Sequence, residues 1–534
     1  MTEERNDTFA SKPWHAKISR RGFIGGGLAV AGAAGFAGFL PDSLLQAAAA
    51  SPATHKGSFN LSQVKHLVFL MMENRSFDHY YGAYPGVAGF SDHHAIRLAN
   101  GNSVFQQPDP SNPDGYLEPF HLDTVNTGAT TVNSLSHAWE DQHASWNLGA
   151  MDGWLAAHMA QNGPVTGQYT MGYYTRDDLP FHWALADNFT LGDQYHCAVL
   201  GPTSPNRIFW QNGTNDPQGL GGGPILDTAT IPVQTYESGA ATLFKAGISF
   251  KWYGVSPGDN EGTWPRFADV MNGPPALSRP AMGVGTLFGD GTPGGIGDPA
   301  NPTMATDPAH PFEEDCANGV LPDVSFLYPG NNQEHPSNTP PQSALGAQGI
   351  AQKLDALASN EELWNTTVFV LVYDENDGFF DHVVPPTPKK ADFPEEFVTK
   401  LSSQGTGTIG GGWPVGAGFR VPCTIISPWT VGGNIFSEVS DHTSCLRLIE
   451  SVATAGGLSG RGPVTFPNIS RWRRQTFGDL TGALGPGKPK PAPTSPEFDP
   501  AVRAAFVTAR TDSAQLPLPP IPGRDQTMPV QPKK

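Results

Sequence analysis

The sequence predicts an α/β fold built on a mainly parallel sheet, and two apolar runs carry this prediction. Residues 67–72 and 368–373 are short stretches of aliphatic and aromatic residues, which is typical of strands buried on both faces. A helical pattern at residues 348–358 leads into the second run. This helix-then-strand order suits a parallel α/β unit.

Shorter elements fill the chain between and after these runs. Apolar stretches with few charges predict strands, and amphipathic stretches predict helices. On this basis we predict helices at residues 181–186 and 441–452 and strands at residues 248–253, 324–328 and 421–427. The Gly- and Pro-rich residues 255–320 are predicted to form a surface insertion.

Composition limits the classes of protein that the chain can belong to. Its 534 residues fit one large α/β domain with insertions, or two or three domains. The 62 Gly and 51 Pro residues, together with 10% aromatic residues, indicate long loops that are ordered by packing. A formal charge of −18 argues against binding nucleic acid through a basic surface.

The N-terminal segment has the features of an export signal. Ser19-Arg20-Arg21-Gly22-Phe23-Ile24 is a twin-arginine pattern, and a weakly apolar stretch follows at residues 24–40. The alanines at 47–50 offer a cleavage site, so we predict a signal peptide at 1–50. The alternative is an uncleaved anchor, for which the stretch is short. The predicted partner is the twin-arginine export machinery, and the predicted location is the periplasm, cell surface or medium.

Four cysteines remain after the predicted signal: Cys197, Cys316, Cys423 and Cys445. They allow three pairings if all are oxidised, and buried free thiols are equally compatible with the sequence. Since no C-x-x-C pair occurs, a zinc site built from thiolates is not expected.

An oxygen-rich pair follows each of the two apolar runs. Glu73-Asn74 ends the first run, and Asp374-Glu375 ends the second. Ligands in open α/β sheets bind beyond the carboxyl ends of the strands, so the two pairs predict one divalent metal site. Such a site is suited to phosphate. The alternative for either pair is a helix N-cap or a solvated loop residue, although the dense Phe and His nearby favours the metal site.

Five ordered blocks carry a resemblance to a known family. They are residues 73–82 (ENRSFDHYYG), 201–207 (GPTSPNR), 334–336 (EHP), 373–383 (YDENDGFFDHV) and 440–444 (SDHTS). These blocks resemble those of the bacterial phosphoesterase family, which includes phospholipases C of the non-haemolytic type and a group of acid phosphatases. The resemblance implies an alkaline-phosphatase-like three-layer sandwich with a central mainly parallel sheet and long loop insertions. The similarity runs from about residue 60 to 475, so we predict a catalytic domain at residues 51–485. Frequent Pro predicts a C-terminal extension at residues 486–534.

The resemblance also assigns roles at the strand ends. Thr203 matches the family's nucleophile, which would attack phosphorus and form a covalent phospho-threonine. Ser204 is the rival hydroxyl, and either could instead be a turn hydroxyl beside Pro205. One divalent metal ion of unknown identity would be held by Glu73, Asn74, Thr203, Asp374 and Glu375.

Three histidines and one arginine complete the candidate site. His137, His335 and His442 are candidates for contacting phosphate or protonating the leaving group, and each could equally make a structural hydrogen bond. Arg207 could pair with phosphate oxygens or bridge to a carboxylate.

The function implied is phospholipase C-like hydrolysis of a phospholipid to diacylglycerol and a phosphorylated headgroup, with at most transient contact with a membrane surface. An acid phosphatase or phosphomonoesterase acting on small phosphoesters is the alternative on the same scaffold, and an inactive secreted binding protein is a remote one. The tryptophans could form a cage for a quaternary ammonium headgroup, or they could be core residues; those considered are Trp139, Trp146, Trp154 and Trp183.

Overall fold

The computed structural model describes most of the chain. The described residues are 40–50, 59–228, 231–254, 262–282, 312–329, 333–336, 342–399, 411–460, 462–485 and 500–533. The twin-arginine pattern and most of the apolar stretch after it lie outside these residues. So do large parts of the predicted insertion at 255–320 and the residues 486–499 of the predicted extension.

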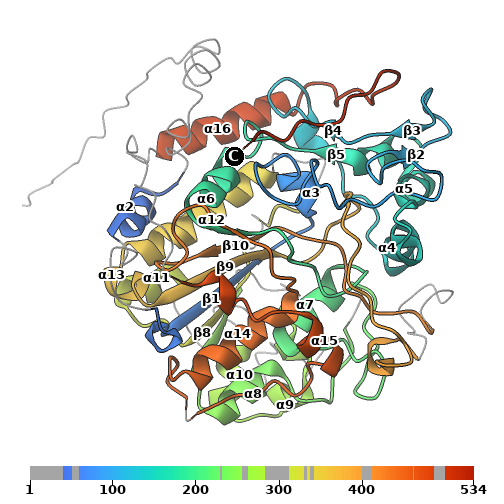
Figure 1. The fold of residues 1–534 in the computed structure, drawn as a ribbon. Coiled ribbons are helices and arrows are strands. Elements are labelled where there is room, and N and C mark those ends of the chain that lie inside the picture. Colours follow the sequence, from blue (N-terminus) through green and yellow to red (C-terminus); the bar gives the residue numbers. More distant parts are fainter. Residues whose placement is uncertain are drawn as a thin grey trace, which may run out of the picture.

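A seven-stranded sheet forms the centre of the molecule (Figure 1). Its strands stand in the order β11-β6-β10-β9-β1-β8-β7. Their bounds are β1 His66–Met72, β6 Thr190–Gly192, β7 Phe250–Tyr253, β8 Val324–Leu327, β9 Thr367–Tyr373, β10 Cys423–Ile426 and β11 Ile435–Phe436. The predicted strands at 67–72, 248–253, 324–328, 368–373 and 421–427 are all confirmed.

Most strand pairs in this sheet are parallel, as predicted. The parallel pairs are β1 with β8, β1 with β9, β7 with β8 and β11 with β6. Only β10 runs against its neighbours β9 and β6. The register pairs Met72 of β1 with Tyr373 of β9, so both strands end at the same level of the sheet.

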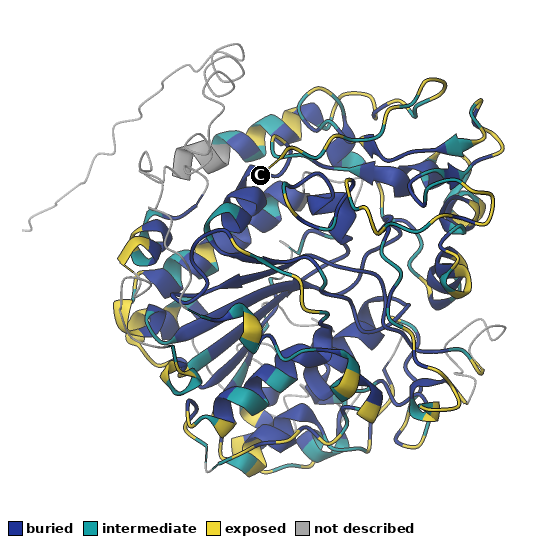
Figure 2. Ribbon diagram, viewed as in Figure 1, coloured by how far each residue is buried: buried dark blue, intermediate teal, exposed yellow. Residues whose placement is uncertain are grey.

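Helices cover both faces of the sheet (Figure 1). Two groups are held together by contacts among their members. The first contains α2 (Asp42–Ala50), α11 (Phe312–Asn318), α12 (Gln342–Ala358), α13 (Glu361–Trp364) and α16 (Pro500–Ser513). The second contains α7 (Thr203–Asn212), α8 (Gly239–Ala246), α9 (Ala268–Met271), α10 (Pro275–Met282) and α14 (His442–Thr454). The strands between them are dark blue in Figure 2, because nearly all of their residues are buried.

The remaining helices lie in the loops between these elements. They are α3 (Phe77–Tyr81), α4 (Trp139–Trp146), α5 (Trp154–Asn162), α6 (Pro180–Asn188) and α15 (Arg471–Thr476). Two small sheets pair β2 (Gln107–Pro108) with β3 (Tyr116–Leu117) and β4 (Phe120–His121) with β5 (Gly172–Tyr173). Helices α6, α12 and α14 confirm the helices predicted at 181–186, 348–358 and 441–452.

One prediction from composition needs correction. Residues 255–320 were expected to form a surface insertion because they are rich in Gly and Pro. Their described part instead contains α9, α10 and α11, and it buries Phe267, Val270 and Leu277. Gly and Pro interrupt helices, yet short helices between them can still pack when apolar residues recur on one face.

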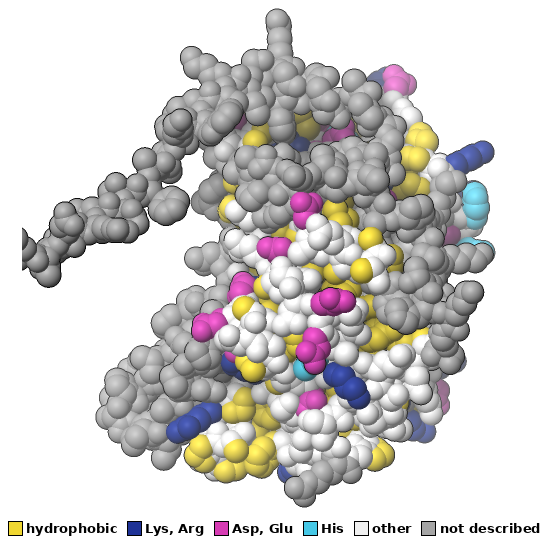
Figure 3. Space-filling view, turned by 90° about the vertical axis from the view of Figure 1, so that its left-hand side faces the viewer, with side chains coloured by type: hydrophobic (Ala, Val, Ile, Leu, Met, Phe, Trp, Pro, Cys, Tyr) yellow, Lys and Arg dark blue, Asp and Glu magenta, His cyan; other side chains and the backbone are white. Residues whose placement is uncertain are grey.

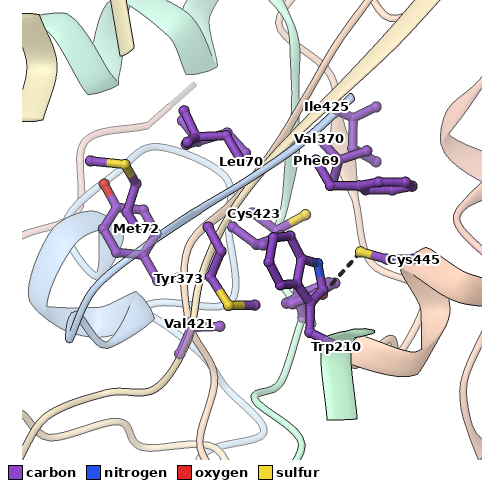
Figure 4. Close-up of a cluster of buried hydrophobic side chains, with 14 of the residues drawn as sticks. Phe69, Leu70, Met72, Trp210, Val370, Tyr373, Val421, Cys423, Ile425 and Cys445 are labelled. Atoms are coloured by element: carbon purple, nitrogen blue, oxygen red, sulfur yellow. Dashed lines mark hydrogen bonds between the residues drawn. The ribbon is translucent and has the colours of Figure 1, made fainter. Parts of the chain in front are cut away.

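The four cysteines are buried free thiols in this structure. Figure 4 shows Cys423 and Cys445 among Phe69, Trp210 and Ile425 in the core beside the sheet. Burial raises the pKa of the Cys445 thiol to about 12, so it stays protonated at neutral pH. The structure therefore favours the free-thiol alternative that the sequence left open.

The two ends of the described chain are packed against the domain. Leu44 and Leu45 of α2 are buried, and Trp364 donates a hydrogen bond from Nε1 to Ala47 O at 3.1 Å. At the other end, Gln526 and Gln531 bond to the main chain of the domain. The segment at 514–533 is therefore fastened along the surface.

The face shown in Figure 3 carries dispersed charges. Acidic side chains lie scattered over it among a few Lys and Arg, in keeping with the formal charge of −18. Among the described residues, no helix is both long and apolar enough to cross a lipid bilayer.

Candidate active site

The shared end of β1 and β9 brings the two oxygen-rich pairs together. The main-chain N–H of Asn74 donates to Asp374 Oδ1 at 3.0 Å, and that of Arg75 donates to Glu375 O at 2.9 Å. Asn74 adopts a left-handed conformation with φ 61°, which Asn tolerates better than most residues. All four members of the two pairs are buried. The predicted juxtaposition of the pairs is confirmed.

In Asn74, Asp374 and Glu375, one side-chain atom is held by hydrogen bonds and one side-chain oxygen accepts none. Asp374 Oδ1 accepts the N–H groups of Asn74 and Glu375, Asn74 Nδ2 donates to Asp377, and Glu375 Oε2 accepts from the N–H of Asp377. Within the described part of the chain, Asn74 Oδ1, Asp374 Oδ2 and Glu375 Oε1 accept no hydrogen bond, although Asp374 Oδ2 forms an ion pair with Arg207. Buried oxygens without donors are costly, and a cation would satisfy all three.

The electrostatics of the cluster also fit a cation. Burial raises the pKa of Glu375 well above its usual range, and the carboxylates of Asp374, Asp377 and Glu73 raise it further. Bringing a positive charge to this cluster would offset the repulsion between the carboxylates. Oxygen donors of this kind suit a hard or borderline divalent ion.

The guanidinium of Arg207 pairs with two of these carboxylates. Its Nη2 lies 3.1 Å from Glu73 Oε1, and its Nε lies 3.3 Å from Asp374 Oδ2. The side chain is fully buried. Of the two roles left open by the sequence, the structure therefore shows the bridge to carboxylates.

Thr203 is the first residue of α7, so it lies at a helix N-terminus. Residues four apart share a helix face, so Thr203 lies one turn from Arg207, whose guanidinium contacts the carboxylate cluster. The preceding turn is held by Asn206, whose Oδ1 accepts from Val199 N at 2.9 Å and whose Nδ2 donates to Gly201 O at 3.0 Å. The N–H groups of the first helical turn, which have no acceptor within the helix, and the helix dipole favour an anion at this end of α7.

His137 and His335 lie next to each other at the site. Their ring centroids are 6.2 Å apart. His137 donates from Nδ1 to Leu135 O at 2.9 Å, and its Nε2 lies 3.8 Å from Glu375 Oε1. His335 donates from Nδ1 to Pro336 O at 2.8 Å. Both rings are partly exposed, so their Nε2 atoms are suited to contact with a substrate oxygen.

His442 has a different environment. It is fully buried at the start of α14, where its Nε2 donates to Asp374 O at 2.7 Å and its Nδ1 accepts from Tyr195 OH at 3.2 Å. Burial lowers the pKa of His442 to about 3, so the ring is neutral near pH 7. With both nitrogens engaged, this geometry favours the structural alternative: His442 ties α14 to the end of β9.

A second group of potential metal ligands contains Asp78, Asp381 and His382, whose ligand atoms lie within 4.8 Å of one another. Here the carboxylate oxygens already accept hydrogen bonds within the protein. Arg420 donates to Asp78 Oδ1 and Asp381 Oδ1 at 3.0 Å each, and His382 donates from Nδ1 to Asp78 Oδ2 at 2.6 Å. The two clusters both offer donors for a metal ion, but the strand-end cluster is the one with unsatisfied oxygens.

The second cluster leads to a prediction about stability and pH. Although burial lowers it, Asp78 and Asp92 raise the pKa of His382 to about 9. Because this pKa is higher in the folded than in the unfolded protein, protonated His382 stabilises the fold fully below about pH 6.5. This stabilisation is lost as pH rises through about 9. The free energy of unfolding falls by on the order of 3 kcal/mol over this range. We therefore expect the melting temperature to fall between about pH 7 and 9.5, and to fall less in His382→Gln. Equal slopes in thermal unfolding of both proteins would contradict this.

The four tryptophans considered for a headgroup cage are all buried, with exposed fractions from 0% to 5%. Trp139 and Trp146 surround the ring of His143, Trp154 packs on Phe419, and Trp183 packs on Tyr84. This packing favours the core alternative over a cage for a quaternary ammonium group.

Sequence reasoning left two residues of this region without a role. Asp377 is fully buried and bonds to both Asn74 and Glu375. Glu334 is also fully buried and accepts from the hydroxyls of Tyr80 and Tyr373. Both lie inside the blocks that carried the resemblance, so their residue types were visible. Their contacts could not be read from the sequence, since those with Asn74 and Tyr80 span 303 and 254 residues.

Comparisons with known proteins agree with the blocks. The model of the Phosphoesterase family matches residues 64–454. The chain is 38% identical to "Phospholipase C B" of Mycobacterium tuberculosis over 459 residues, which cover 82% of this chain and 81% of that protein. It is 36% identical to the "Non-hemolytic phospholipase C" of Burkholderia pseudomallei over 504 residues, or 88% of this chain.

Coverage of these relatives differs. The chain spans 65% of the length of the Burkholderia protein, or about two thirds. Among solved structures, one from Vibrio parahaemolyticus described as a protein in the alkaline phosphatase superfamily matches with a TM-score of 0.30 and 11% identity. The matched part covers 83% of this chain and 80% of that one.

Proposed function

Because this chain belongs to the phosphoesterase family, we propose that it is a metal-dependent phosphoesterase of the phospholipase C type. It would cleave a phospholipid into diacylglycerol and a phosphorylated headgroup. The observation that carries the proposal is a cluster of three buried oxygens that accept no hydrogen bond, on Asn74, Asp374 and Glu375. The cluster lies beside the helix that begins at Thr203. The lipid substrate is supported by the names of the relatives.

The residues present suit one divalent ion. Glu73, Asn74, Asp374 and Glu375 would hold it, together with the Thr203 oxygen. When bound, such an ion lowers the pKa of a coordinated hydroxyl and offsets negative charge on a phosphate. Arg207 keeps Glu73 and Asp374 aligned through its two ion pairs.

The chain's own groups account for binding of the phosphate. The N–H groups at the start of α7 present partial positive charge to the phosphate oxygens. The Thr203 hydroxyl lies at that end of the helix, on the face that also carries Arg207. Ser204 belongs instead to the face of Ile208, which is fully buried. This arrangement supports Thr203 as the nucleophile.

Two transfers would complete the reaction. In the first, Thr203 Oγ1 gives its proton to solvent water and bonds to phosphorus, and the bond from phosphorus to the diacylglycerol oxygen breaks. The leaving oxygen needs a proton, which His137 or His335 can supply from Nε2 in its protonated form. In the second, water attacks phosphorus, the phospho-threonine bond breaks, and Thr203 Oγ1 takes a proton back from solvent water. The same histidine accepts the proton of the attacking water.

The substrate class is tested by comparing rates on three compounds under the same conditions. They are a chromogenic phosphomonoester, a phosphorylcholine diester and phosphatidylcholine in micelles. We expect the two diesters to be cleaved with higher kcat/KM than the monoester. A preference for the monoester would favour a phosphatase on the same scaffold, and no turnover of any would favour a binding protein.

We also propose that the chain is exported by the twin-arginine route. The supporting observation is the pattern around Arg20 and Arg21 followed by an apolar stretch. Replacing both arginines with lysine should retain the protein inside the cell, as cell fractionation would show. N-terminal sequencing of the exported protein would also establish whether α2 remains part of it.

A further inference from the structure

Asp377 lies four residues beyond the end of β9 and belongs to none of the roles described so far. It is fully buried and has a left-handed backbone, with φ 56°. A non-glycine residue in this conformation is uncommon, and such residues cluster at sites where the surrounding structure fixes them. The contacts of Asp377 show what fixes it.

One set of contacts reaches the cation ligands. Asp377 Oδ2 accepts from Asn74 Nδ2 at 3.3 Å, which turns the amide so that its Oδ1 is the atom left without a donor. The main-chain N–H of Asp377 donates to Glu375 Oε2, which leaves Glu375 Oε1 without a donor. Asp377 thus sets the orientation of the Asn74 amide and determines which Glu375 oxygen remains for a cation.

A second set of contacts reaches the segment that carries His137. Asp377 Oδ1 accepts from the N–H of Leu135, and Oδ2 accepts from Ser134 Oγ at 2.7 Å. Asp377 O accepts from Gln142 Nε2 in α4. His137 itself lies close, with Nδ1 at 3.6 Å from Asp377 Oδ2. The same carboxylate therefore holds the loop before α4 against the strand-end cluster.

We propose that Asp377 is a positioning residue that holds the cation ligands Asn74 and Glu375 and the His137 segment in one arrangement. The inference rests on the proposed function, because it assigns these residues to one reaction. A carboxylate is required here because its two oxygens accept four hydrogen bonds, from Asn74, Ser134, Leu135 and Gly378. Asparagine has one accepting oxygen, and its NH₂ group would meet the NH₂ group of Asn74. Partners of this kind orient metal ligands and are worth about 10- to 100-fold in metal affinity.

The test is Mn²⁺ binding to the full-length protein freed of metal by a chelator, followed by electron paramagnetic resonance of the free ion. We expect Asp377→Asn to raise the dissociation constant by about 10- to 100-fold. Asp377→Gly is a second variant that favours folding, because glycine adopts positive φ without strain. It removes the carboxylate and retains the main-chain bond to Glu375, and it should bind Mn²⁺ more weakly than wild type as well.

Asp178→Asn is the matched control. Asp178 is a buried carboxylate that also accepts from loop N–H and hydroxyl groups, those of Thr124 and Thr175. It contacts none of the cation ligands in the described structure. Its substitution should lower the melting temperature and leave Mn²⁺ affinity unchanged, which separates positioning from a general loss of stability.

The His137 part of the inference is tested by a double-mutant cycle on kcat at saturating Mn²⁺. If Asp377 positions His137, then Asp377→Asn should cost less in a His137→Ala background than in the wild type. An equal loss of kcat from Asp377→Asn in both backgrounds would overturn this part. A folded Asp377 variant that binds Mn²⁺ as tightly as wild type would overturn the first part. If wild type itself neither binds Mn²⁺ nor needs a divalent ion for turnover, the proposed function fails instead.

Discussion

Thr203→Ala is expected to abolish turnover, with kcat lowered by at least about a thousandfold. The reason is that the variant lacks the oxygen that would bond to phosphorus, and the neighbouring groups offer no replacement on the same face of α7. The melting temperature should change little, since loss of one hydroxyl at a helix N-terminus typically costs about 1 kcal/mol or less. Steady-state kinetics and thermal unfolding of the same preparation measure both quantities.

Ser204→Ala is the control for this experiment. Ser204 is the next residue along α7 and is buried to a similar degree, 7% exposed against 5% for Thr203. The Ser204→Ala variant should keep most of its activity, because Ser204 belongs to the helix face of Ile208. Near-normal turnover in Thr203→Ala, or loss of turnover in Ser204→Ala, would remove Thr203 from the role of nucleophile.

Asp374→Asn is expected to lower bound metal and turnover together. Its Oδ1 can still accept from Asn74 and Glu375, as in the native protein. Its NH₂ group, however, would replace Oδ2 and would face the guanidinium of Arg207, which is also a donor. We expect metal affinity to fall by at least about a hundredfold, more than for a residue outside the ligand set.

The matched control is Asp323→Asn. Asp323 comes directly before β8, so it lies at the amino ends of the parallel strands, whereas Asp374 lies at their carboxyl ends. Asp323 is buried and accepts from Ser249 and Ser459. Elemental analysis of both variants after gel filtration, with the rate on the preferred diester, makes the comparison. Full metal content in Asp374→Asn would exclude Asp374 as a ligand, whereas lost metal in Asp323→Asn would point to general destabilisation.

Much of the sheet could be predicted from local patterns. Runs such as 368–373 are apolar without interruption, which only a strand buried on both faces requires. The direction of β10 could not be predicted in the same way, because an apolar run of four residues looks alike in either direction. The helices inside 255–320 were missed because their Gly and Pro neighbours dominate the composition.

The site was predicted in part for similar reasons. Glu73-Asn74 and Asp374-Glu375 are adjacent in sequence and follow strands, so their meeting could be inferred from parallel pairing. The roles of His442 and Asp377 could not, since they depend on hydrogen bonds to residues 68 and 303 positions away. A motif gives the residue type, but burial and partners decide whether a histidine contacts the substrate or holds a helix in place.

The central claim is that phosphoester cleavage proceeds through a covalent intermediate on Thr203, at the N-terminus of α7. It is tested most directly by quenching the enzyme with acid during turnover of its preferred diester and mapping the phosphorylated peptide by mass spectrometry. The account predicts one phosphorylated headgroup on Thr203, that is, the phosphorus with the headgroup alcohol that it retains, absent without substrate and absent in Thr203→Ala. The same adduct on Ser204 or any other residue would contradict it.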